Sequence, residues 1–373
     1  MEPGHLLLTG GGTGGHIYPA IAIADAVRAR RPQTEVLFVG NADGLEASIV
    51  PNAGYAIRFV PSRPLDRRSP RALVRTIASN IAGVAGAVRA LRAFKPSTIV
   101  ATGGYVCFPV VLAARLLRVL RMCDAHIALL EPNARPGLTA RLVGPLVDEV
   151  WAAYPAARPF FRKEVIITGA PVRREVTRAT EPPAAREALG LEPDRVTIVV
   201  MGGSQGARSI NEAVVALVTR RTLPERWQLL HICGRRDYAY MAAEQRDTGS
   251  NKVVLVPYLD DPSAAYAAAD IVIARAGAST LAELAATGTP SLLVPYPHAT
   301  DDHQRKNAEV FVGAGAARTL NDAELSGDAL WWALLDLLDS GALAAMRSAA
   351  RAIAPGDAAL GIAQRIEALG AHG

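Results

Sequence analysis

The sequence predicts an α/β protein made of two halves, each a parallel sheet covered by helices. Strand-like apolar runs alternate with helical stretches along the chain, and two glycine-rich turns, at residues 10–15 and 202–207, each follow an apolar run and open a helix. The two turns lie about 190 residues apart, as expected when one supersecondary pattern occurs twice. We therefore expect two doubly wound domains facing one cleft.

The first half shows the alternation that is typical of parallel strands joined by crossover helices. The expected strands are residues 6–9, 35–39, 98–101, 126–130 and 149–152. The expected helices are residues 19–31, 71–93, 109–121 and 137–142, the first of them opening at Pro19, since the first helical turn tolerates proline.

Prolines cluster at residues 154–159 and 169–171, which places a domain boundary near residue 170. The alternation then restarts. The expected strands of the second half are residues 196–201, 228–233, 253–256, 270–274 and 291–294. A helical segment after residue 345 is broken at Pro355 and Gly356 and resumes at residues 357–369.

Composition excludes several classes of protein. A chain of 373 residues that is 50% hydrophobic can fill two ordinary cores, and it is not a disordered chain. No run of eighteen apolar residues occurs, and the N-terminus lacks the charged region and cleavage site of a signal peptide, so we expect a cytoplasmic protein. Its three cysteines have neither paired nor zinc-ligand spacing, which indicates reduced thiols.

Positive charge is concentrated between residues 58 and 121, where twelve basic residues face one acid, Asp66. Apolar residues at helical spacing lie among them: Leu73, Val74, Ile77, Ile81, Val84 and Val88. Two interpretations stay open. The stripe is either the buried side of an ordinary amphipathic helix with a solvated arginine face, or a surface that enters a membrane. Aromatic residues are not interleaved with the basic ones, so nucleic-acid binding is not expected.

Both glycine-rich turns are suited to holding a phosphate. Backbone N–H groups without a helical partner point outward at the positive end of a helix dipole, and glycine allows a diphosphate to approach closely. The first turn also matches the dinucleotide fingerprint, but the second strand ends without a well-placed acid, and Asp43 comes late. Neither turn contains a Walker lysine.

His16 directly follows the first turn. The positive helix end disfavours its protonated form, so the neutral ring is a candidate general base. A plain hydrogen-bonding role is the equally weighted alternative.

Glu283 follows the expected strand 270–274 and lies three residues after Thr280. That spacing matches a capping box, in which the acid closes back on the helix N-terminus. A carboxylate at this place in a nucleotide site can also accept from both hydroxyls of a ribose. The spacing alone does not choose between the two.

Arg173 lies just past the expected boundary, where it either reaches a diphosphate or is an ordinary surface arginine. A third glycine-rich turn, at residues 103–105, offers another anion site. No Asp-x-Asp pair and no His/Cys cluster occurs at ligand spacing, so neither a metal nor another cofactor is expected.

Together these motifs resemble one family over nearly the whole chain. GGTGGHIYP at 11–19, GGY at 103–105, EPN at 131–133, PVR at 171–173, GGSQGA at 202–207, ASTLAE at 278–283 and Gln304 before Asn307 appear in order. This set is similar to the MurG family of N-acetylglucosaminyltransferases, which convert lipid I to lipid II in peptidoglycan synthesis. Four positions depart from the commoner family pattern: Pro132, the pair Cys107 and Phe108, and Ala170. One extra residue also lies between Glu283 and Gln304.

The resemblance implies a GT-B fold and an inverting transfer of N-acetylglucosamine from UDP-N-acetylglucosamine to the muramyl 4-hydroxyl of undecaprenyl-linked lipid I. It implies an acceptor- and membrane-facing domain at residues 1–170, joined by the returning C-terminal helix 346–373, and a UDP-sugar domain at residues 171–345. The implied location is the cytoplasmic face of the bacterial inner membrane, with the protein peripheral and docked on anionic lipid.

The resemblance also implies site residues. His16 is the family's candidate base. The acceptor diphosphate would lie on Gly11, Gly12, Gly103, Gly104 and Tyr105. In the second domain the donor would contact Ser204, Gln205, Leu259, Ala278, Ser279, Thr280, Leu281, Ala282, Glu283 and Gln304. Donor contacts from the first domain would be Thr13, Gly14, Gly15, Asn133 and Arg173.

Two other functions remain as alternatives at this point. One is a related UDP-sugar enzyme with a soluble acceptor, such as a natural-product glycosyltransferase or an epimerase. The other is a peripheral membrane protein that binds nucleotide without turning it over.

Overall fold

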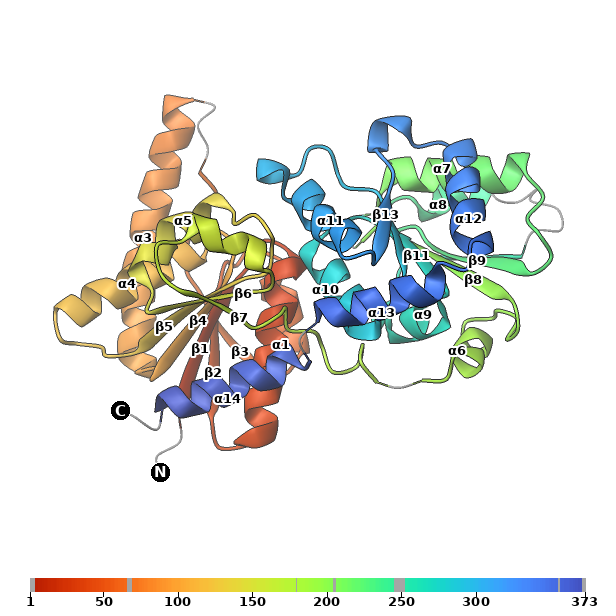
Figure 1. The fold of residues 1–373 in the computed structure, drawn as a ribbon. Helices are drawn as coiled ribbons and strands as arrows, with labels where there is room; N and C mark the ends of the chain where they lie inside the picture. The colour runs from red at the N-terminus through yellow and green to blue at the C-terminus, as the bar shows by residue number, and fades with distance from the viewer. Residues whose placement is uncertain are drawn as a thin grey trace. The chain divides into compact units, whose positions relative to one another are not determined.

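The computed structural model describes residues 4–65, 69–178, 180–203, 206–244, 252–354 and 356–370. The chain divides into two compact units (Figure 1). Unit 1 comprises Met1–Arg173 and Gly356–Gly373, and unit 2 comprises Arg174–Pro355. Each contains one sheet whose strands all run parallel, as the alternating sequence pattern predicts.

The sheet of unit 1 has seven strands in the described part of the chain, in the order β3-β2-β1-β4-β5-β6-β7. The strands are β1 (His5–Gly10), β2 (Glu35–Gly40), β3 (Ala56–Phe59), β4 (Thr98–Gly103), β5 (His126–Glu131), β6 (Glu149–Ala152) and β7 (Val165–Ile167). The helices are α1 (Gly14–Arg30), α2 (Glu46–Asn52), α3 (Pro70–Phe94), α4 (Cys107–Val119), α5 (Leu138–Val143) and α14 (Ala358–Gly370).

Successive side chains along these strands point to opposite faces, and each face has its own core. Leu7, Ile99 and Leu129 pack with α3, α4 and α5 on one face. Leu8 and Val100 pack with α1, α2 and α14 on the other face. Because both faces are covered, the central strands β1, β2, β4, β5 and β6 consist almost entirely of buried residues, as is typical of parallel sheets.

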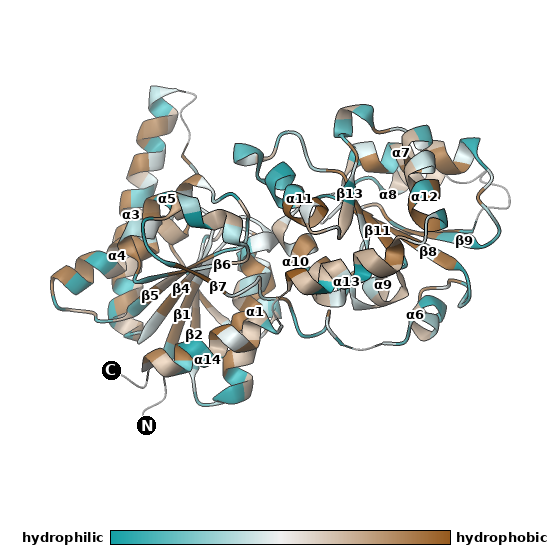
Figure 2. Ribbon diagram, viewed as in Figure 1, coloured by the Kyte–Doolittle hydropathy of each residue, from teal (hydrophilic) through white to brown (hydrophobic). Residues whose placement is uncertain are grey.

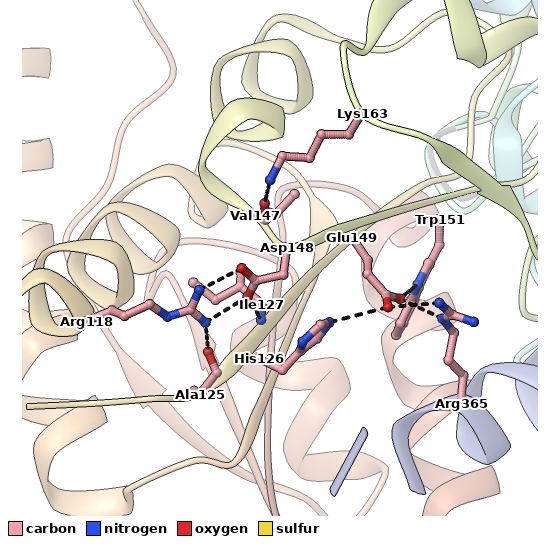
Figure 3. A network of polar contacts seen from close by, with 10 residues as sticks. All are labelled: Arg118, Ala125, His126, Ile127, Val147, Asp148, Glu149, Trp151, Lys163 and Arg365. Carbon is pink, nitrogen blue, oxygen red and sulfur yellow. Dashed lines mark hydrogen bonds and ion pairs between the residues drawn. The ribbon is translucent and has the colours of Figure 1, made fainter. Parts of the chain in front are cut away.

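The terminal helix α14 is fixed to this sheet by an ion-pair network at the amino ends of the strands (Figure 3). Arg365 donates from Nε and Nη2 to the two carboxylate oxygens of Glu149 at 2.6 and 2.8 Å. The Trp151 indole donates to the same carboxylate at 2.7 Å. Burial raises the pKa of Glu149, but the hydrogen bonds from Arg365 and Trp151 outweigh burial and lower the pKa overall. The carboxylate therefore stays ionised and ties α14 to β6.

The sheet of unit 2 has six strands among the described residues, in the order β10-β9-β8-β11-β12-β13. The strands are β8 (Val196–Met201), β9 (Trp227–Ile232), β10 (Val253–Val256), β11 (Ile271–Ala274), β12 (Ser291–Leu293) and β13 (Ala317–Thr319). The helices are α6 (Pro182–Ala188), α7 (Arg208–Arg220), α8 (Tyr238–Glu244), α9 (Ser263–Ala268), α10 (Ala278–Thr287), α11 (His303–Gly313), α12 (Gly327–Asp339) and α13 (Leu343–Ile353). Helices α7 and α12 pack on one face of this sheet, and α9 and α10 lie on the other (Figure 1).

The sequence prediction was wrong about where the first helix begins. We expected it to open at Pro19, but α1 begins at Gly14, with Thr13 as its N-cap in extended conformation. Pro19 lies inside the helix, where its missing N–H leaves the carbonyl of Gly15 without its usual helical partner. The consequence is that His16 lies in the first helical turn and not before it.

Short elements were also missed. Helix α2 and strands β3, β7 and β13 were not expected, and each is seven residues long or shorter. Strand β3 lies at the sheet edge and none of its residues is fully buried, so the alternation that signals a strand is absent from it.

Candidate active site at the carboxyl ends of both sheets

The strand order of both units reverses direction beside the first strand. In unit 1 the chain moves outward from β1 to β2 and β3, and then returns to place β4 on the other side of β1. Unit 2 repeats this arrangement around β8, with β11 on its other side. Ligands of open α/β sheets bind outside the carboxyl ends of the strands at such a switch point. The glycine-rich turns at 10–15, 103–105 and 202–207 all lie there.

The two glycine turns of unit 1 are in direct contact with each other. The N–H of Gly11 donates to the carbonyl of Gly103 at 3.2 Å. A Cβ atom on Gly104 would lie 2.1 Å from the carbonyl oxygen of Gly11, so only glycine fits there. Gly103 and Gly104 both have positive φ, of 110° and 84°, which glycine adopts without strain. The acceptor residues suggested by the resemblance, with Tyr105 beside Gly12, are therefore one cluster.

The His16 ring, in the first turn of α1, is held by β4, the strand that pairs with β1. Its Nδ1 lies 2.9 Å from the carbonyl oxygen of Thr102, at the end of β4, and a carbonyl only accepts. Nδ1 therefore carries the proton, and in the neutral ring the lone pair is on Nε2. The Thr102 hydroxyl donates in turn to the His16 carbonyl at 2.7 Å. This fixed tautomer is the one that a general base acting through Nε2 requires.

Asn133 is fixed by a buried acid. Both its backbone N–H and its Nδ2 donate to Oε1 of Glu131 at 2.9 Å. Glu131 ends β5, next to the turn at 103–105, and is 3% exposed. Burial raises the pKa of Glu131 to about 7, although the hydrogen bonds from Asn133 act in the opposite direction.

Arg173, the last residue of unit 1, lies against the first helical turn. Its guanidinium stacks over the ring of Tyr18, with 4.3 Å between the guanidinium carbon and the ring centroid. The Tyr18 ring in turn packs on Gly14, where a Cβ would lie 3.0 Å from it. Tyr18 is thus the defined packing partner of Arg173 and connects it to Gly14.

Cys107, which follows the turn at 103–105, is part of this cluster. Its thiol is buried and donates to the carbonyls of Thr9 and Gly103 at 3.2 and 3.0 Å. Burial raises the pKa of the thiol to about 12. Cys107 therefore remains a protonated thiol that supports the two turns.

In unit 2 the glycine-rich turn joins β8 to α7. Gly203 and Gly206 have positive φ, of 82° and 75°, and the N–H of Gly206 donates to the carbonyl of Gly203 at 3.0 Å. Ser204 and Gln205 lie outside the described residues. A buried network supports the turn: Asn211 donates to the carbonyl of Cys233 and to Asp237, both at 2.9 Å.

The other expected donor residues lie at this same edge of the sheet. Leu259 follows β10, the segment Ala278, Ser279, Thr280, Leu281, Ala282 and Glu283 follows β11, and Gln304 lies in the first turn of α11, after β12. The side chain of Gln304 accepts from the N–H of Tyr296 at 2.9 Å. The two residues next to α11, Asp301 and Asp302, have φ of 54° and 56°, a left-handed conformation that costs energy in residues other than glycine.

The capping-box interpretation of Glu283 was wrong. The N-cap of α10 is Gly277, not Thr280, and it makes no side-chain cap hydrogen bond. Glu283 lies in the second turn of the helix, half-buried, and its Oε2 accepts from the hydroxyl of Tyr266 at 2.8 Å. Its carboxylate is therefore oriented by a neighbouring helix, α9, and not used to close α10.

Arg275 connects four segments around this edge, a role the sequence analysis missed. Its Nη1 donates to Asp322 at 2.6 Å and to the carbonyl of Val294 at 3.0 Å, and its Nη2 donates to the hydroxyl of Ser209 at 2.8 Å. It therefore joins the turn after β11, where it lies, to the start of α7, to the residue after β12 and to the segment that contains Asp322. The sequence gives no local sign of this role, because the acidic partner of Arg275, Asp322, lies 47 residues away in the chain.

Among the described residues no group of three or more His, Cys, Asp or Glu side chains is placed to hold a metal ion. In the same part of the chain no single helix is long and apolar enough to cross a membrane. One bent pair of helices, Gly327–Asp339 with Leu343–Leu369, is long and apolar enough to cross a membrane by length and composition alone.

Comparison with known proteins matches both halves. The glycosyltransferase family 28 N-terminal domain matches residues 6–152, and the corresponding C-terminal domain matches residues 197–361. The UDP-N-acetylglucosamine–N-acetylmuramyl-(pentapeptide) pyrophosphoryl-undecaprenol N-acetylglucosamine transferase of Moorella thermoacetica is 40% identical over 371 residues, covering 98% of this chain and 96% of that protein. The chain belongs to the MurG family.

Solved structures agree with this membership of the MurG family. Acinetobacter baumannii MurG superposes with a TM-score of 0.78 at 25% identity, covering 98% of this chain and 99% of that one. The glycotransferase of kitacinnamycin, at 17% identity and a TM-score of 0.71, shares the fold. The chain is thus a glycosyltransferase with the GT-B fold, as the resemblance of its motifs implied.

Glu131 gives a pH-dependent stability that can be measured. Because its pKa is about 7 in the folded protein and near 4.5 when exposed, the folded state binds a proton that the unfolded chain has released. Its contribution is fully present below pH 4.5 and is lost as the pH rises through 7. Between pH 5 and 8 the free energy of unfolding of the wild type should fall relative to that of Glu131→Gln by up to about 3 kcal/mol.

Denaturant unfolding of the two proteins at four pH values in that range measures this difference. Parallel pH dependences of the wild type and the Glu131→Gln variant would show that Glu131 is ionised in the folded protein over the whole range.

Proposed function

We propose that this chain transfers N-acetylglucosamine from UDP-N-acetylglucosamine to the muramyl 4-hydroxyl of undecaprenyl-linked lipid I, forming lipid II. The observation that carries the proposal is the position of the family motifs: they follow the carboxyl ends of parallel strands, and the three glycine-rich ones lie at the β1/β4 and β8/β11 switch points. Near-full-length similarity to the Moorella thermoacetica transferase supports the same reaction and substrates.

Unit 2 is the proposed UDP-sugar domain. The first-turn N–H groups of α7 and the glycine turn before it, with Ser204 and Gln205, would hold the diphosphate. Glu283 would accept from the ribose hydroxyls and the backbone of Leu259 would contact the uracil. Ser279, Thr280 and Gln304 would lie near the sugar. The half-buried, oriented carboxylate of Glu283 supports this role, because two adjacent acceptor oxygens match two adjacent hydroxyls.

Unit 1 is the proposed acceptor domain. The contacting turns at 11–15 and 103–105 would bind the lipid-linked diphosphate, and Thr13, Gly14, Gly15, Asn133 and Arg173 would add donor contacts. His16 is the proposed base: its Nε2 lone pair takes the proton of the 4-hydroxyl as that oxygen attacks the anomeric carbon. The bond from this carbon to the β-phosphate breaks, and UDP leaves with the electron pair. One displacement inverts the configuration and gives a β-1,4 link.

The stabilisation of the leaving group needs neither metal nor cofactor in this proposal. Amides at the second glycine turn, the hydroxyl of Ser204 and the guanidinium of Arg173 would meet the charge that develops on UDP. Donors aimed at developing charge commonly contribute about 2.7 to 4 kcal/mol each to transition-state stability.

We also propose that unit 1 docks on the cytoplasmic face of the bacterial inner membrane as a peripheral protein. The first half of α3 supports this: Val74, Ile77 and Ile81 are 65%, 49% and 65% exposed, with Arg71 and Arg75 exposed among them. Figure 2 shows this helix alternating between hydrophobic and hydrophilic residues along its length. Val84 and Val88, further along α3, pack against the core. The predicted apolar stripe is therefore buried only in its second half.

The reaction is tested by measuring UDP release from UDP-N-acetylglucosamine by the purified protein, with and without a lipid I analogue. We expect release that requires the analogue and yields a disaccharide product. Equal release with soluble sugar acceptors in place of the analogue would favour a different acceptor class. Donor binding without any release would contradict enzymatic transfer.

Removing the Glu283 carboxylate should weaken donor binding. A carboxylate that accepts from two ribose hydroxyls contributes charge-assisted hydrogen bonds, and their loss in Glu283→Ala should raise the Kd for UDP by about 10- to 100-fold. Titration calorimetry with UDP measures the change. Glu309→Ala, which removes an exposed carboxylate of α11, is the matched control and should leave the Kd unchanged. Equal affinities of the Glu283→Ala variant and the wild type would contradict the ribose role.

Membrane docking should depend on both charge and exposed apolar surface. Each basic residue near an anionic bilayer contributes about 1 kcal/mol, so Arg71→Glu with Arg75→Glu should weaken binding to phosphatidylglycerol vesicles by more than about tenfold. Ile77→Ser should also weaken binding, because an apolar side chain that would enter the bilayer is lost. This loss of affinity should depend less on salt than the loss caused by the charge reversals. Co-sedimentation at two salt concentrations measures both variants. Indifference of binding to salt and to both substitutions would exclude this surface.

A further inference from the structure

A buried carboxylate holds the first glycine turn, and nothing in the proposed reaction uses it. Glu46 is the first residue of α2 and is 1% exposed. Its Oε2 accepts from the N–H of Gly12 at 3.0 Å, and its Oε1 accepts from the N–H of Asn41 at 2.9 Å. Gly12 follows β1 and Asn41 follows β2, which pairs with β1. One side chain therefore joins the carboxyl ends of two neighbouring strands.

Three glycines make the space that this side chain occupies. A Cβ on Gly11 would lie 2.2 Å from Oε1 of Glu46, one on Gly40 would lie 2.6 Å from its Cγ, and one on Gly44 would lie 2.3 Å from its Oε2. Contacts below 3.0 Å are not tolerated, so each of these positions must lack a side chain while the carboxylate is in place. Gly11, Gly40, Gly44 and Glu46 thus pack together, and they come from two segments of the chain, the turn after β1 and the connection from β2 to α2.

This contact determines which N–H groups of the turn face outward. The N–H of Gly11 is used by the carbonyl of Gly103 and that of Gly12 by Glu46. Gly14 and Gly15 begin α1, and the first N–H groups of a helix have no partner within it. Because Glu46 takes the inner N–H group, the turn presents its helix-end N–H groups to an anion.

His16 is held by a separate set of contacts. Its ring donates to the carbonyl of Thr102, and the hydroxyl of Thr102 donates to its backbone carbonyl. Both of these contacts come from β4 and neither involves Glu46. A change at Glu46 should therefore disturb the turn more than the proposed base.

We propose that Glu46 is a positioning residue for the acceptor, whose carboxylate holds residues 11–15 in the conformation that binds the lipid-linked diphosphate. This inference rests on the proposed function of unit 1. It predicts a specific kinetic signature: loss of the carboxylate raises the KM for the acceptor much more than it raises the Kd for UDP, because unit 2 supplies most of the proposed UDP contacts. The kcat at saturating acceptor changes little.

The test is Glu46→Gln. Glutamine keeps the size of the side chain but has one oxygen, so the N–H of either Gly12 or Asn41 meets an NH₂ group that cannot accept. The KM for a lipid I analogue should rise on the order of 10- to 100-fold, as a small displacement of a binding group does. Glu149→Gln is the matched control. It makes the same chemical change at a half-buried carboxylate at the opposite edge of the same sheet, and it should leave this KM unchanged.

Hydrogen exchange gives a second readout, which does not depend on activity. In Glu46→Gln the amides of residues 10–17 should exchange faster, and those of residues 126–131 should not. Gly44→Ala should have the same effect on exchange, because the added methyl group would displace the Glu46 carboxylate from the other side. It replaces Glu46→Gln in the test if the glutamine variant does not fold.

Three results would overturn the proposal: an acceptor KM in Glu46→Gln no higher than in Glu149→Gln, an equal rise in the Kd for UDP, or unchanged exchange in residues 10–17. Failure of the proposed function is distinguishable, because the wild type itself would then release no UDP with the analogue.

Discussion

The close approach of the turns after β1 and β4 is the constraint on which the unit 1 site depends. Gly104 lies so near the backbone of Gly11, and Gly103 so near the ring of His16, that a Cβ on either would come within 2.4 Å of its neighbour. Only because side chains are absent can two strand ends share one small area. That area then contains a helix N-terminus, a histidine of fixed tautomer and Tyr105.

Around these two turns, buried polar side chains hold the backbone and the site residues in place through hydrogen bonds. Glu46 fixes the N–H of Gly12 in the first turn, Thr102 fixes His16, and Glu131 fixes Asn133, through hydrogen bonds at 2.7 to 3.0 Å. A site made of turns would otherwise be mobile, since loops make few buried contacts. In unit 2 the contacts of Arg275 and Asn211 serve the corresponding purpose beside β8 and β11.

The sequence was sufficient for the fold and for the order of the motifs, because strand periodicity and glycine turns are local signals. It was insufficient where a contact joins distant residues. Glu46 looks like an ordinary acid at a helix start, yet its partner Gly12 lies 34 residues away. The spacing of Thr280 and Glu283 matched a capping box, but the helix begins earlier, at Ala278, because Gly277 takes the N-cap position. Pro19 misled in the same way, since the buried side of α1 stabilises a helix that continues through the proline.

The central claim is that unit 2 binds the UDP-sugar at its β8/β11 edge and unit 1 binds the acceptor diphosphate at its β1/β4 edge. Hydrogen exchange of the wild type with each ligand alone tests it most directly, because amides that bind phosphate exchange more slowly. UDP should slow exchange most in residues 201–213 and 278–287, and a lipid I analogue should slow it most in residues 10–17 and 102–107. The reverse pattern, or strongest protection of the same unit by both ligands, would contradict the account.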